Sequence, residues 1–283
     1  MFSETKSRLS ADKAGSAGKK DWDILVVDDE QVVIDAVVKI CSSENFTVDS
    51  AIDAKEALQK FAKNNYKLIV CDIMMHGIDG FGFLDELRKR KISTPVIMTT
   101  GYSTVENAVK SLYTGAIDFI PKPFTSDELI NSVVRGMKYL EIQNLLKTYN
   151  REGSDIIYVL CPSKYFRLGY SSWVAEENSG SVLIGATDLF IKTIESISDL
   201  ELFKVDDETI QGNSCAFIKD KDERMHPLLS PVSGRIIEVN EELKKNKSLI
   251  EKDPYFEGWF YRLIPSDSEY ELKNLINCSS DRL

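Results

Sequence analysis

Histidine is nearly absent from this chain, which has only two histidines among its 283 residues. Many metal sites and hydrolytic triads depend on imidazole, so a site of either kind has little to draw on. His226 stands directly before Pro227, and we interpret it as a turn residue rather than a ligand. No Ser-His-Asp, Cys-His or kinase-like set of residues is evident, so the sequence does not predict an enzyme.

Cysteine pairs and long apolar runs are also missing. The five cysteines are odd in number and contain no Cys-x-x-Cys motif, which is typical of buried thiols in a reducing compartment. No apolar run reaches the length of a signal peptide or a membrane span, so we expect a cytoplasmic protein without a membrane partner. Residues 1–20 mix Ser, Ala, Gly and Lys without apolar periodicity, which predicts a disordered tail.

The first half of the chain does contain four short apolar runs, each followed by polar residues. They are Ile24-Leu-Val-Val27, Leu68-Ile-Val-Cys71, Val96-Ile-Met98 and Phe119-Ile120. Segments with helical periodicity lie between them, and this alternation predicts an α/β domain whose parallel sheet has helices on both faces. The length of the chain predicts about two domains.

Five polar residues stand at or just beyond the ends of these runs: Asp28, Asp29, Asp72, Thr100 and Lys122. In parallel sheets, ligands bind beyond the carboxyl ends of the strands, so we expect these side chains to meet there. Three carboxylates brought together need a cation, and ligands that are all oxygen favour Mg²⁺. A hydroxyl and an ammonium group beside them suit a phosphoryl group.

Four motifs in this half follow one another in the order and spacing of a known family. They are Val26-Val-Asp-Asp-Glu30, Cys71-Asp-Ile-Met-Met75 with Gly80, Pro95-Val-Ile-Met-Thr-Thr-Gly101, and Gly115-Ala116 followed by Lys122-Pro-Phe124. Through these motifs, residues 21–140 resemble the response regulator receiver domain of two-component signalling. The resemblance implies a flavodoxin-like fold with five parallel strands. It also implies a sensor histidine kinase or a phosphotransfer protein as partner.

The resemblance also implies a role for each matching position. Asp72 would be the phosphoacceptor, Thr100 and Lys122 would contact the phosphoryl oxygens, and Phe119 would be the aromatic switch residue. The residues implied to hold Mg²⁺ are Asp28, Asp29, Asp72 and, through its backbone carbonyl, Met74. His76 stands where the family usually has proline, and we expect it to loosen that loop without changing the chemistry.

Each motif alone has a structural alternative. An Asp-Asp-Glu sequence after a strand often only begins a helix with favourable acidic residues, and an isolated Lys-Pro is usually a turn. Because all four motifs occur together and in order, we predict an active receiver rather than an inactive domain of the same fold.

The helix expected from Ser126 is longer than a compact domain needs, because its apolar stripe continues to about residue 149. We expect residues 141–155 to form a helical linker that ends at Asn150-Arg-Glu-Gly-Ser154. The extension either packs on the second domain or pairs with another copy of the chain. Packing within the chain is the favoured interpretation, and a homodimer is the alternative.

Residues 156–283 contain short strand-like runs at close spacing, which predict a small β sandwich or barrel. Helical stretches at 187–197 and 241–249 interrupt these runs. The segments Ile184-Gly-Ala-Thr-Asp188, Ser230-Pro-Val-Ser-Gly234 and Glu238-Val-Asn-Glu-Glu-Leu243 resemble parts of the H protein of the glycine cleavage system. The resemblance implies a lipoyl-type flattened β barrel.

The lysine that defines this family is missing from its expected place. The resemblance implies a lipoyl-lysine at a hairpin tip eight residues before the Pro-Val-Ser-Gly turn, where Asp222 or Glu223 stands in this chain. A carboxylate cannot form the amide bond to lipoic acid, so we predict a domain without lipoate. Modification of the nearby Lys219 or Lys221 is the alternative.

Basic charge is scarce in this second half. Residues 151–283 contain 16 Lys or Arg and 24 Asp or Glu, a net charge of −8. Nucleic-acid binding needs a basic surface, so we expect no nucleic-acid partner. The leading hypothesis is a response regulator whose output is protein binding by the H-like domain. A phospho-regulated lipoyl carrier and an atypical transcription regulator are the two alternatives.

Overall fold

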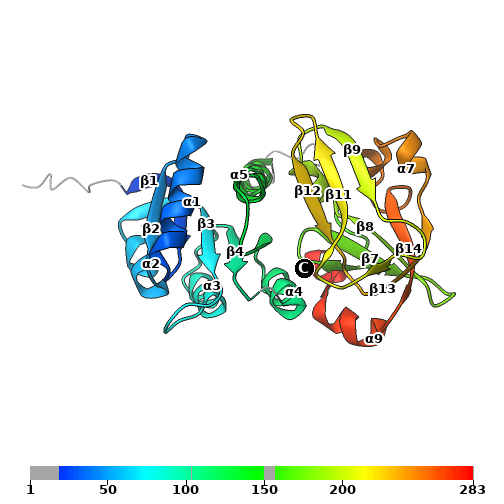
Figure 1. Ribbon diagram of the computed structural model, residues 1–283, viewed down its shortest axis with the longest axis horizontal. Coiled ribbons are helices and arrows are strands. Elements are labelled where there is room, and N and C mark those ends of the chain that lie inside the picture. Colours follow the sequence, from blue (N-terminus) through cyan, green and yellow to red (C-terminus); the bar gives the residue numbers. More distant parts are fainter. Residues whose placement is uncertain (1–18, 103, 150–156, 283) are drawn as a thin grey trace, which may run out of the picture.

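The computed structural model describes residues 19–102, 104–149 and 157–282, which form two domains (Figure 1). The N-terminal domain has a five-stranded parallel sheet in the order β2-β1-β3-β4-β5. Its strands are β1 (Lys20–Val27), β2 (Val48–Ala51), β3 (Asn64–Asp72), β4 (Val96–Thr100) and β5 (Asp118–Pro121). Its helices are α1 (Gln31–Ser43), α2 (Ala54–Lys60), α3 (Gly80–Lys89), α4 (Val105–Tyr113) and α5 (Ser126–Tyr149). The predicted flavodoxin-like α/β fold is confirmed.

The sheet of this domain is buried on both faces, which explains its nearly continuous apolar strands. One face packs on α2 and α3, where Phe83 and Leu87 are fully buried. The other packs on α1 and α5 through Ile34, Leu129 and Val133. The remaining helix of this domain, α4, lies next to the C-terminal domain (Figure 1).

The C-terminal domain is mostly antiparallel, with one seven-stranded and one three-stranded sheet. The order of the larger sheet is β10-β13-β14-β8-β7-β6-β15, and that of the smaller sheet is β12-β11-β9. Its strands are β6 (Phe166–Leu168), β7 (Ser172–Glu176), β8 (Val182–Ala186), β9 (Ile197–Leu202), β10 (Glu208–Thr209), β11 (Ser214–Asp220), β12 (Met225–Leu229), β13 (Gly234–Val239), β14 (Trp259–Pro265) and β15 (Ile276–Asn277). Its short helices are α6 (Asp188–Lys192), α7 (Glu242–Lys245), α8 (Leu249–Lys252), α9 (Ser268–Glu271), η1 (Leu272–Asn274) and η2 (Cys278–Arg282). The predicted mostly-β fold is therefore confirmed.

Several local predictions for this domain were wrong. The helix expected over 187–197 ends at Lys192, and β9 begins at Ile197 just after the left-handed Ser196. The helix expected over 241–249 is broken into two short helices, because Asn246 adopts a non-helical conformation with φ −139° and ψ 84°. No strand forms over 157–160, where the Val159 amide instead donates to the Asp188 carboxylate at 2.6 Å.

His226 was predicted to be a turn residue, and this prediction was wrong. It lies in β12 and is 2% exposed. Proline is tolerated in this strand because β12 lies at the edge of its sheet, where one row of amide groups needs no strand partner. The expected tail falls mostly on residues 1–18, outside the described residues, as does the predicted helix end at 150–154.

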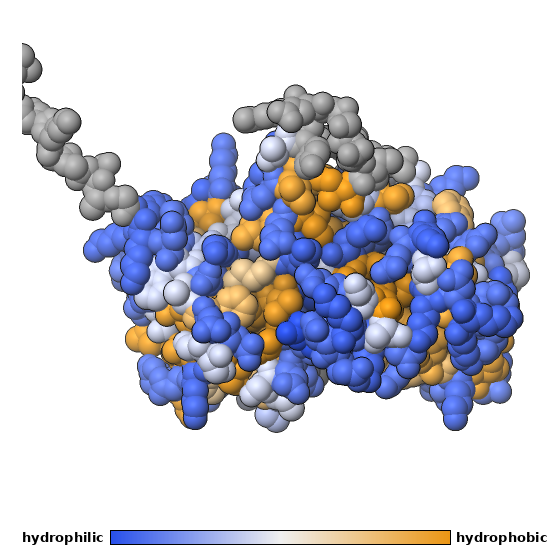
Figure 2. Space-filling view, turned by 90° about the horizontal axis from the view of Figure 1, so that it is seen from above, coloured by the Kyte–Doolittle hydropathy of each residue, from blue (hydrophilic) through white to orange (hydrophobic). Residues whose placement is uncertain are grey.

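Helix α5 connects the two domains, and its extension packs on the C-terminal domain. The ring centroids of Tyr139 and Tyr170 are 5.3 Å apart, and Ile142 is buried. Packing within the chain was the favoured prediction for this segment. Seen from above, the surface is mostly hydrophilic with separate hydrophobic patches (Figure 2), and Leu145 of α5 is 45% exposed. Scattered exposure of this kind is ordinary for a folded chain, and the alternative of a homodimer stays untested.

Helix α4 packs directly on the C-terminal domain, where Val109 and Leu112 belong to that domain's hydrophobic cluster. Two glycines permit this approach, and both have positive φ. A Cβ atom on Gly169 would lie 2.9 Å from the Leu112 side chain, and one on Gly212 would lie 3.0 Å from that of Val109. The first distance is shorter than real Cβ contacts, and the second would make the Val109 side chain give by a few tenths of an ångström, so a larger residue at either position would press against α4.

Candidate functional site

The five polar residues predicted to converge do meet at the carboxyl edge of the parallel sheet. Asp72 and Thr100 are the last residues of β3 and β4. Asp28 follows β1 directly, and Lys122 follows β5. This meeting is a consequence of topology, because parallel strands all end at one edge.

Lys122 is the centre of the cluster. Its Nζ atom lies 2.7 Å from Asp28 Oδ2 and 2.7 Å from Asp72 Oδ1. Asp28 and Asp72 are almost fully buried, at 2% and 4% exposure. Buried carboxylates are costly unless they are paired, so the ammonium group of Lys122 stabilises both acids.

The electrostatic environment follows from burial and from these ion pairs. Burial raises the pKa of Asp72, although hydrogen bonding and attraction to Lys122 work in the opposite direction. Burial alone would lower the pKa of Lys122, but its contacts with Asp28 and Asp72 outweigh this effect and raise the pKa. Lys122 therefore stays protonated and positively charged at neutral pH.

Asp29 and Met74 flank the same edge. Asp29 Oδ2 accepts hydrogen bonds from the His76 backbone amide at 3.0 Å and lies 2.6 Å from His76 Nδ1. The hydrogen bond to His76 lowers the pKa of Asp29. The Met74 amide donates to Asp72 Oδ2 at 2.8 Å. His76 thus bonds to one of the acids that the resemblance implies as a Mg²⁺ ligand.

No group of three acidic, histidine or cysteine side chains is arranged as a metal site in the described ranges. Lys122 occupies the space between Asp28 and Asp72, and Asp29 faces His76. The donor set is nevertheless suitable for Mg²⁺, because it consists of carboxylate oxygens and a nearby backbone carbonyl. Both contacts of His76 are with Asp29 Oδ2, so Mg²⁺ would be held through Oδ1 or by exchange of Oδ2 for the metal.

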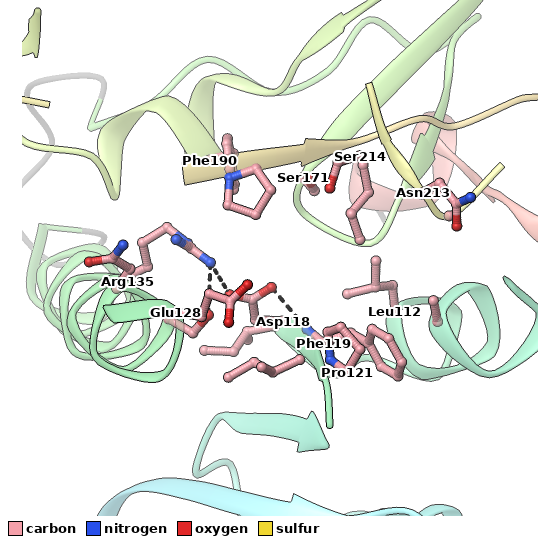
Figure 3. Close-up of a pocket in the computed structure, with 18 of the residues that line it drawn as sticks. Leu112, Asp118, Phe119, Pro121, Glu128, Arg135, Ser171, Phe190, Asn213 and Ser214 are labelled. Atoms are coloured by element: carbon pink, nitrogen blue, oxygen red, sulfur yellow. Dashed lines mark hydrogen bonds and ion pairs between the residues drawn. The ribbon is translucent and has the colours of Figure 1, made fainter. Parts of the chain in front are cut away.

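Thr100 and Phe119 lie on neighbouring strands of the sheet. Thr100 is fully buried, and its Oγ1 accepts a hydrogen bond from the Tyr102 amide at 3.1 Å. Phe119 is half-buried, and its ring lines a cavity against the C-terminal domain (Figure 3). The proposed switch residue therefore stands at the contact between the domains.

A hydrogen-bonded chain, which we call the interdomain relay, runs from β5 to the β11–β12 hairpin through Asp118, Arg135, His226 and Asp220. Arg135 pairs with Asp118, and its Nη1 lies 2.8 Å from His226 Nδ1. A guanidinium group can only donate, so Nδ1 accepts and the proton is on Nε2. His226 Nε2 then donates to Asp220 Oδ2 at 3.0 Å. Asp118 also accepts from the Phe119 amide at 2.9 Å.

Sequence reasoning missed the interdomain relay. Arg135 and His226 are 91 positions apart, and neither belongs to a motif of either resemblance. The only available signal was Arg135 itself, a charged residue within the buried part of the helix stripe. Such a residue, at 5% exposure, needs a partner.

The hairpin tip expected to lack a lipoyl-lysine lies beside the N-terminal domain. Asp222, Glu223 and Arg224 line a hollow with residues of α1 and of the N-terminal part of α5. Lys219 pairs with Glu223, and Lys221 Nζ lies 3.3 Å from Glu195. Asn131 Nδ2 donates to the Met225 carbonyl at 3.1 Å, which fixes this hairpin against α5.

Family comparisons identify both domains. Residues 24–134 match the response regulator receiver domain, and residues 164–281 match the glycine cleavage H-protein. The chain therefore joins a receiver domain to a glycine cleavage H-protein domain, as both resemblances implied. No helix of the described part of the chain is long and apolar enough to cross a membrane.

The chain is similar to several response regulators. It is 36% identical to the nitrogen assimilation regulatory protein NtrX of Azorhizobium caulinodans over 43% of this chain and 27% of that protein. It is 34% identical to the transcriptional regulatory protein TcrA of Mycobacterium tuberculosis over 46% of this chain and 51% of that protein. The chain thus spans only about a quarter to a half of these curated relatives.

Two solved structures are similar to separate parts of the chain. The receiver domain of NtrX from Brucella abortus is 40% identical over 41% of this chain and 98% of that chain, with a TM-score of 0.39. A glycine cleavage system H protein from Mycobacterium marinum is 25% identical over 37% of this chain and 86% of that chain, with a TM-score of 0.34.

Proposed function

We propose that this chain is a two-component response regulator that is phosphorylated on Asp72 and acts through protein binding by its H-like domain. The observation that carries the proposal is the cluster in which the half-buried Lys122 contacts the buried Asp28 and Asp72 at equal distances of 2.7 Å. A buried acid with a fixed lysine beside it is suited to accept a phosphoryl group and to hold the product. The donor would be a sensor histidine kinase or a phosphotransfer protein.

The transfer requires little from the protein beyond positioning and charge. An oxygen of Asp72 attacks the phosphorus of a phosphohistidine, so a P–O bond forms while the P–N bond breaks and the leaving imidazole keeps the electron pair. Lys122 then has a phosphoryl oxygen as its anionic partner in place of the free carboxylate. Mg²⁺ held by Asp28, Asp29, Asp72 and the Met74 carbonyl would neutralise charge on the transferring group.

The residues next to Lys122, Asp28 and Asp72 suggest how phosphorylation would affect the H-like domain. Thr100 would turn its hydroxyl from the Tyr102 amide to the new phosphoryl group, and Phe119 would follow by leaving its place against the C-terminal domain. The amide of Phe119 is bonded to Asp118, which pairs with Arg135 of the interdomain relay. Movement of β5 would therefore weaken the contact of Arg135 with His226 and release the H-like domain to bind a protein partner.

The phosphorylation step is tested with beryllofluoride, whose fluoride ligands stand for the phosphoryl oxygens. With Mg²⁺ present, we expect saturable binding by the native chain and none by Asp72→Asn. Asp85→Asn is a matched control, since Asp85 is an exposed residue of α3 that pairs with Lys89. Unchanged acetyl-phosphate labelling of Asp72→Asn would overturn the assignment.

A further inference from the structure

One face of α5 is held by the H-like domain. Its residues occur at positions i, i+4, i+7 and i+8, so they lie on one side of the helix. We call this face the α5 stripe, and it consists of Asn131, Arg135, Lys138 and Tyr139. Asn131 Nδ2 donates to the Met225 carbonyl at 3.1 Å, and the ring centroids of Tyr139 and Tyr170 are 5.3 Å apart. Domains that bind an amphipathic helix contact it at this spacing, so the H-like domain holds α5 as such a domain holds its target.

Arg135 is the buried centre of the α5 stripe, at 5% exposure, and lies where α5 meets the H-like domain (Figure 3). The H-like domain presents two groups to its guanidinium group. His226 Nδ1 accepts from Nη1 at 2.8 Å, and the centroid of the Phe190 ring lies 5.7 Å from Cζ, within reach of a cation–π contact. His226 donates its other N–H to Asp220 at 3.0 Å, which fixes Nδ1 as the acceptor. An acceptor beside an aromatic ring suits a planar guanidinium group better than an ammonium group.

The charge of the H-like domain favours a basic helix at this surface. Lys138 Nζ of the α5 stripe lies 3.9 Å from the Glu195 carboxylate. A partly exposed pair of this kind contributes little affinity by itself, but it has the same sign as the rest of the domain. Residues 151–283 have a net charge of −8. Charge complementarity of this kind mainly favours specificity and fast association.

The other side of α5 belongs to the receiver domain. Leu129 and Val133 are fully buried in the receiver core, so α5 would move with the receiver domain if the two domains separated. Separation would leave His226 Nδ1 and the Phe190 ring without the guanidinium group of Arg135. The surface that α5 leaves would then offer the same contacts to another helix.

We propose that the H-like domain is a receptor for a basic amphipathic helix of a partner protein, and that α5 is the internal occupant of this site. An arginine of the partner takes the place of Arg135 between His226 and Phe190. The partner helix carries a hydrogen-bond donor one turn before this arginine, and a basic residue followed by an aromatic residue one turn after it. The release of the site by phosphorylation rests on the proposed function, whereas the chemistry of the site does not.

The probe is a fluorescent synthetic peptide of residues 126–149 that carries Leu129→Gln and Val133→Gln, so that it cannot pack in the receiver core. Its binding to the full chain is measured by fluorescence anisotropy. With beryllofluoride and Mg²⁺ present, we expect saturable binding that is at least tenfold tighter than without beryllofluoride, because α5 occupies the site in the closed chain. Light scattering should find the beryllofluoride-bound chain to be a monomer. A dimer would make α5 of a second copy the occupant and would overturn the proposal.

The arginine site is tested by further changes in the probe. Arg135→Ala should weaken binding at least tenfold, and Arg135→Lys should have an intermediate effect, because lysine keeps the charge but lacks the planar group. Lys147→Ala, at an exposed position of the same helix, should bind like the probe. In a chain with Phe190→Leu, the ratio of affinities between the probe and its Arg135→Ala form should fall at least threefold, since the facing ring is removed. An unchanged ratio, or equal weakening by Lys147→Ala, would overturn the arginine site.

A second chain separates this inference from the proposed function. The double variant Asn131→Ala with Arg135→Ala lacks two internal contacts of the α5 stripe, so it should bind the probe at least tenfold more tightly than the native chain without beryllofluoride. Binding to this variant without any effect of beryllofluoride on the native chain would contradict the proposed function and support the receptor. Absence of saturable binding to both chains, with beryllofluoride present, would overturn the receptor itself.

Discussion

His226 is a neutral imidazole in a buried, charged setting. Burial and the positive charge of Arg135 lower its pKa from 6.5 to about 4, against the opposing effect of Asp220. The groups that face it are Arg135 on α5, Asp118 on β5 and Asp220 on β11. The hydrogen bond from His226, with those from nearby backbone amides, outweighs burial and lowers the pKa of Asp220. Protonation of His226 would place a second N–H against the guanidinium group.

This setting predicts a pH dependence of stability. The unfolded chain binds a proton on His226 more readily than the folded chain, so this contribution is complete above pH 6.5 and is lost as the pH falls toward 4. The full loss is about 3 kcal/mol. His226→Gln, which cannot titrate, should lack this part of the pH slope in urea unfolding measured from pH 7.5 to 4. Identical slopes for the two chains would show that His226 is not buried in neutral form.

At the level of secondary-structure elements, the β11–β12 hairpin has acids where the resemblance to the H protein implies a modified lysine. We expect intact mass spectrometry of the chain from its native cells to find no lipoyl group, because Asp222 and Glu223 offer no amine. Glu223→Lys should be modified weakly at most, since its neighbours also differ from the family's pattern. An added lipoyl mass on Lys219 or Lys221 would support the carrier alternative instead.

The contact of α4 is also testable at this level. Gly212 and Gly180 have nearly equal φ of 81° and 82°, but only Gly212 meets the other domain, and a Cβ atom on Gly180 would have no neighbour within 4 Å. Gly180→Ala should therefore cost only the backbone strain of roughly 1–2 kcal/mol. Gly212→Ala should cost more and should also separate the domains, measured as an increased radius of gyration in X-ray scattering. An unchanged radius would mean that α4 can move aside.

For the whole molecule, phosphorylation should change the arrangement of the domains. Beryllofluoride with Mg²⁺ is expected to increase the radius of gyration of the native chain. Thr100→Ala should accept phosphate on Asp72 nearly as well but open far less, because it lacks the hydroxyl that bonds the phosphoryl group. The loss of such a hydrogen bond to a charged group removes about 1.5–3 kcal/mol of the free energy with which phosphorylation favours the open arrangement. Equal opening at equal phosphorylation would exclude this role of Thr100.

The receiver domain could be predicted from the sequence in detail, but the arrangement of the two domains could not. Asp28, Asp72 and Lys122 stand at or directly after the ends of strands whose parallel pairing brings them together, so the local pattern was sufficient. Arg135 and His226 meet through a contact between domains, for which no periodicity exists. Pro227 suggested a turn because a single sequence does not reveal that β12 is an edge strand. That Asp29 holds Mg²⁺ stays a prediction, and the pattern gave no sign that the Asp29 carboxylate would bond to His76.

The continuous helix α5 has a consequence for affinity. Because one helix carries the receiver domain and also packs on the H-like domain, the two surfaces meet as parts of one molecule. Their effective concentration is then in the millimolar range typical of short connections. A modest interface therefore suffices to keep the two domains in contact. A partner protein that binds the same surface must compete with this effective concentration. Phosphorylation needs only to weaken the internal contact, not to abolish it, for a partner at cellular concentration to bind.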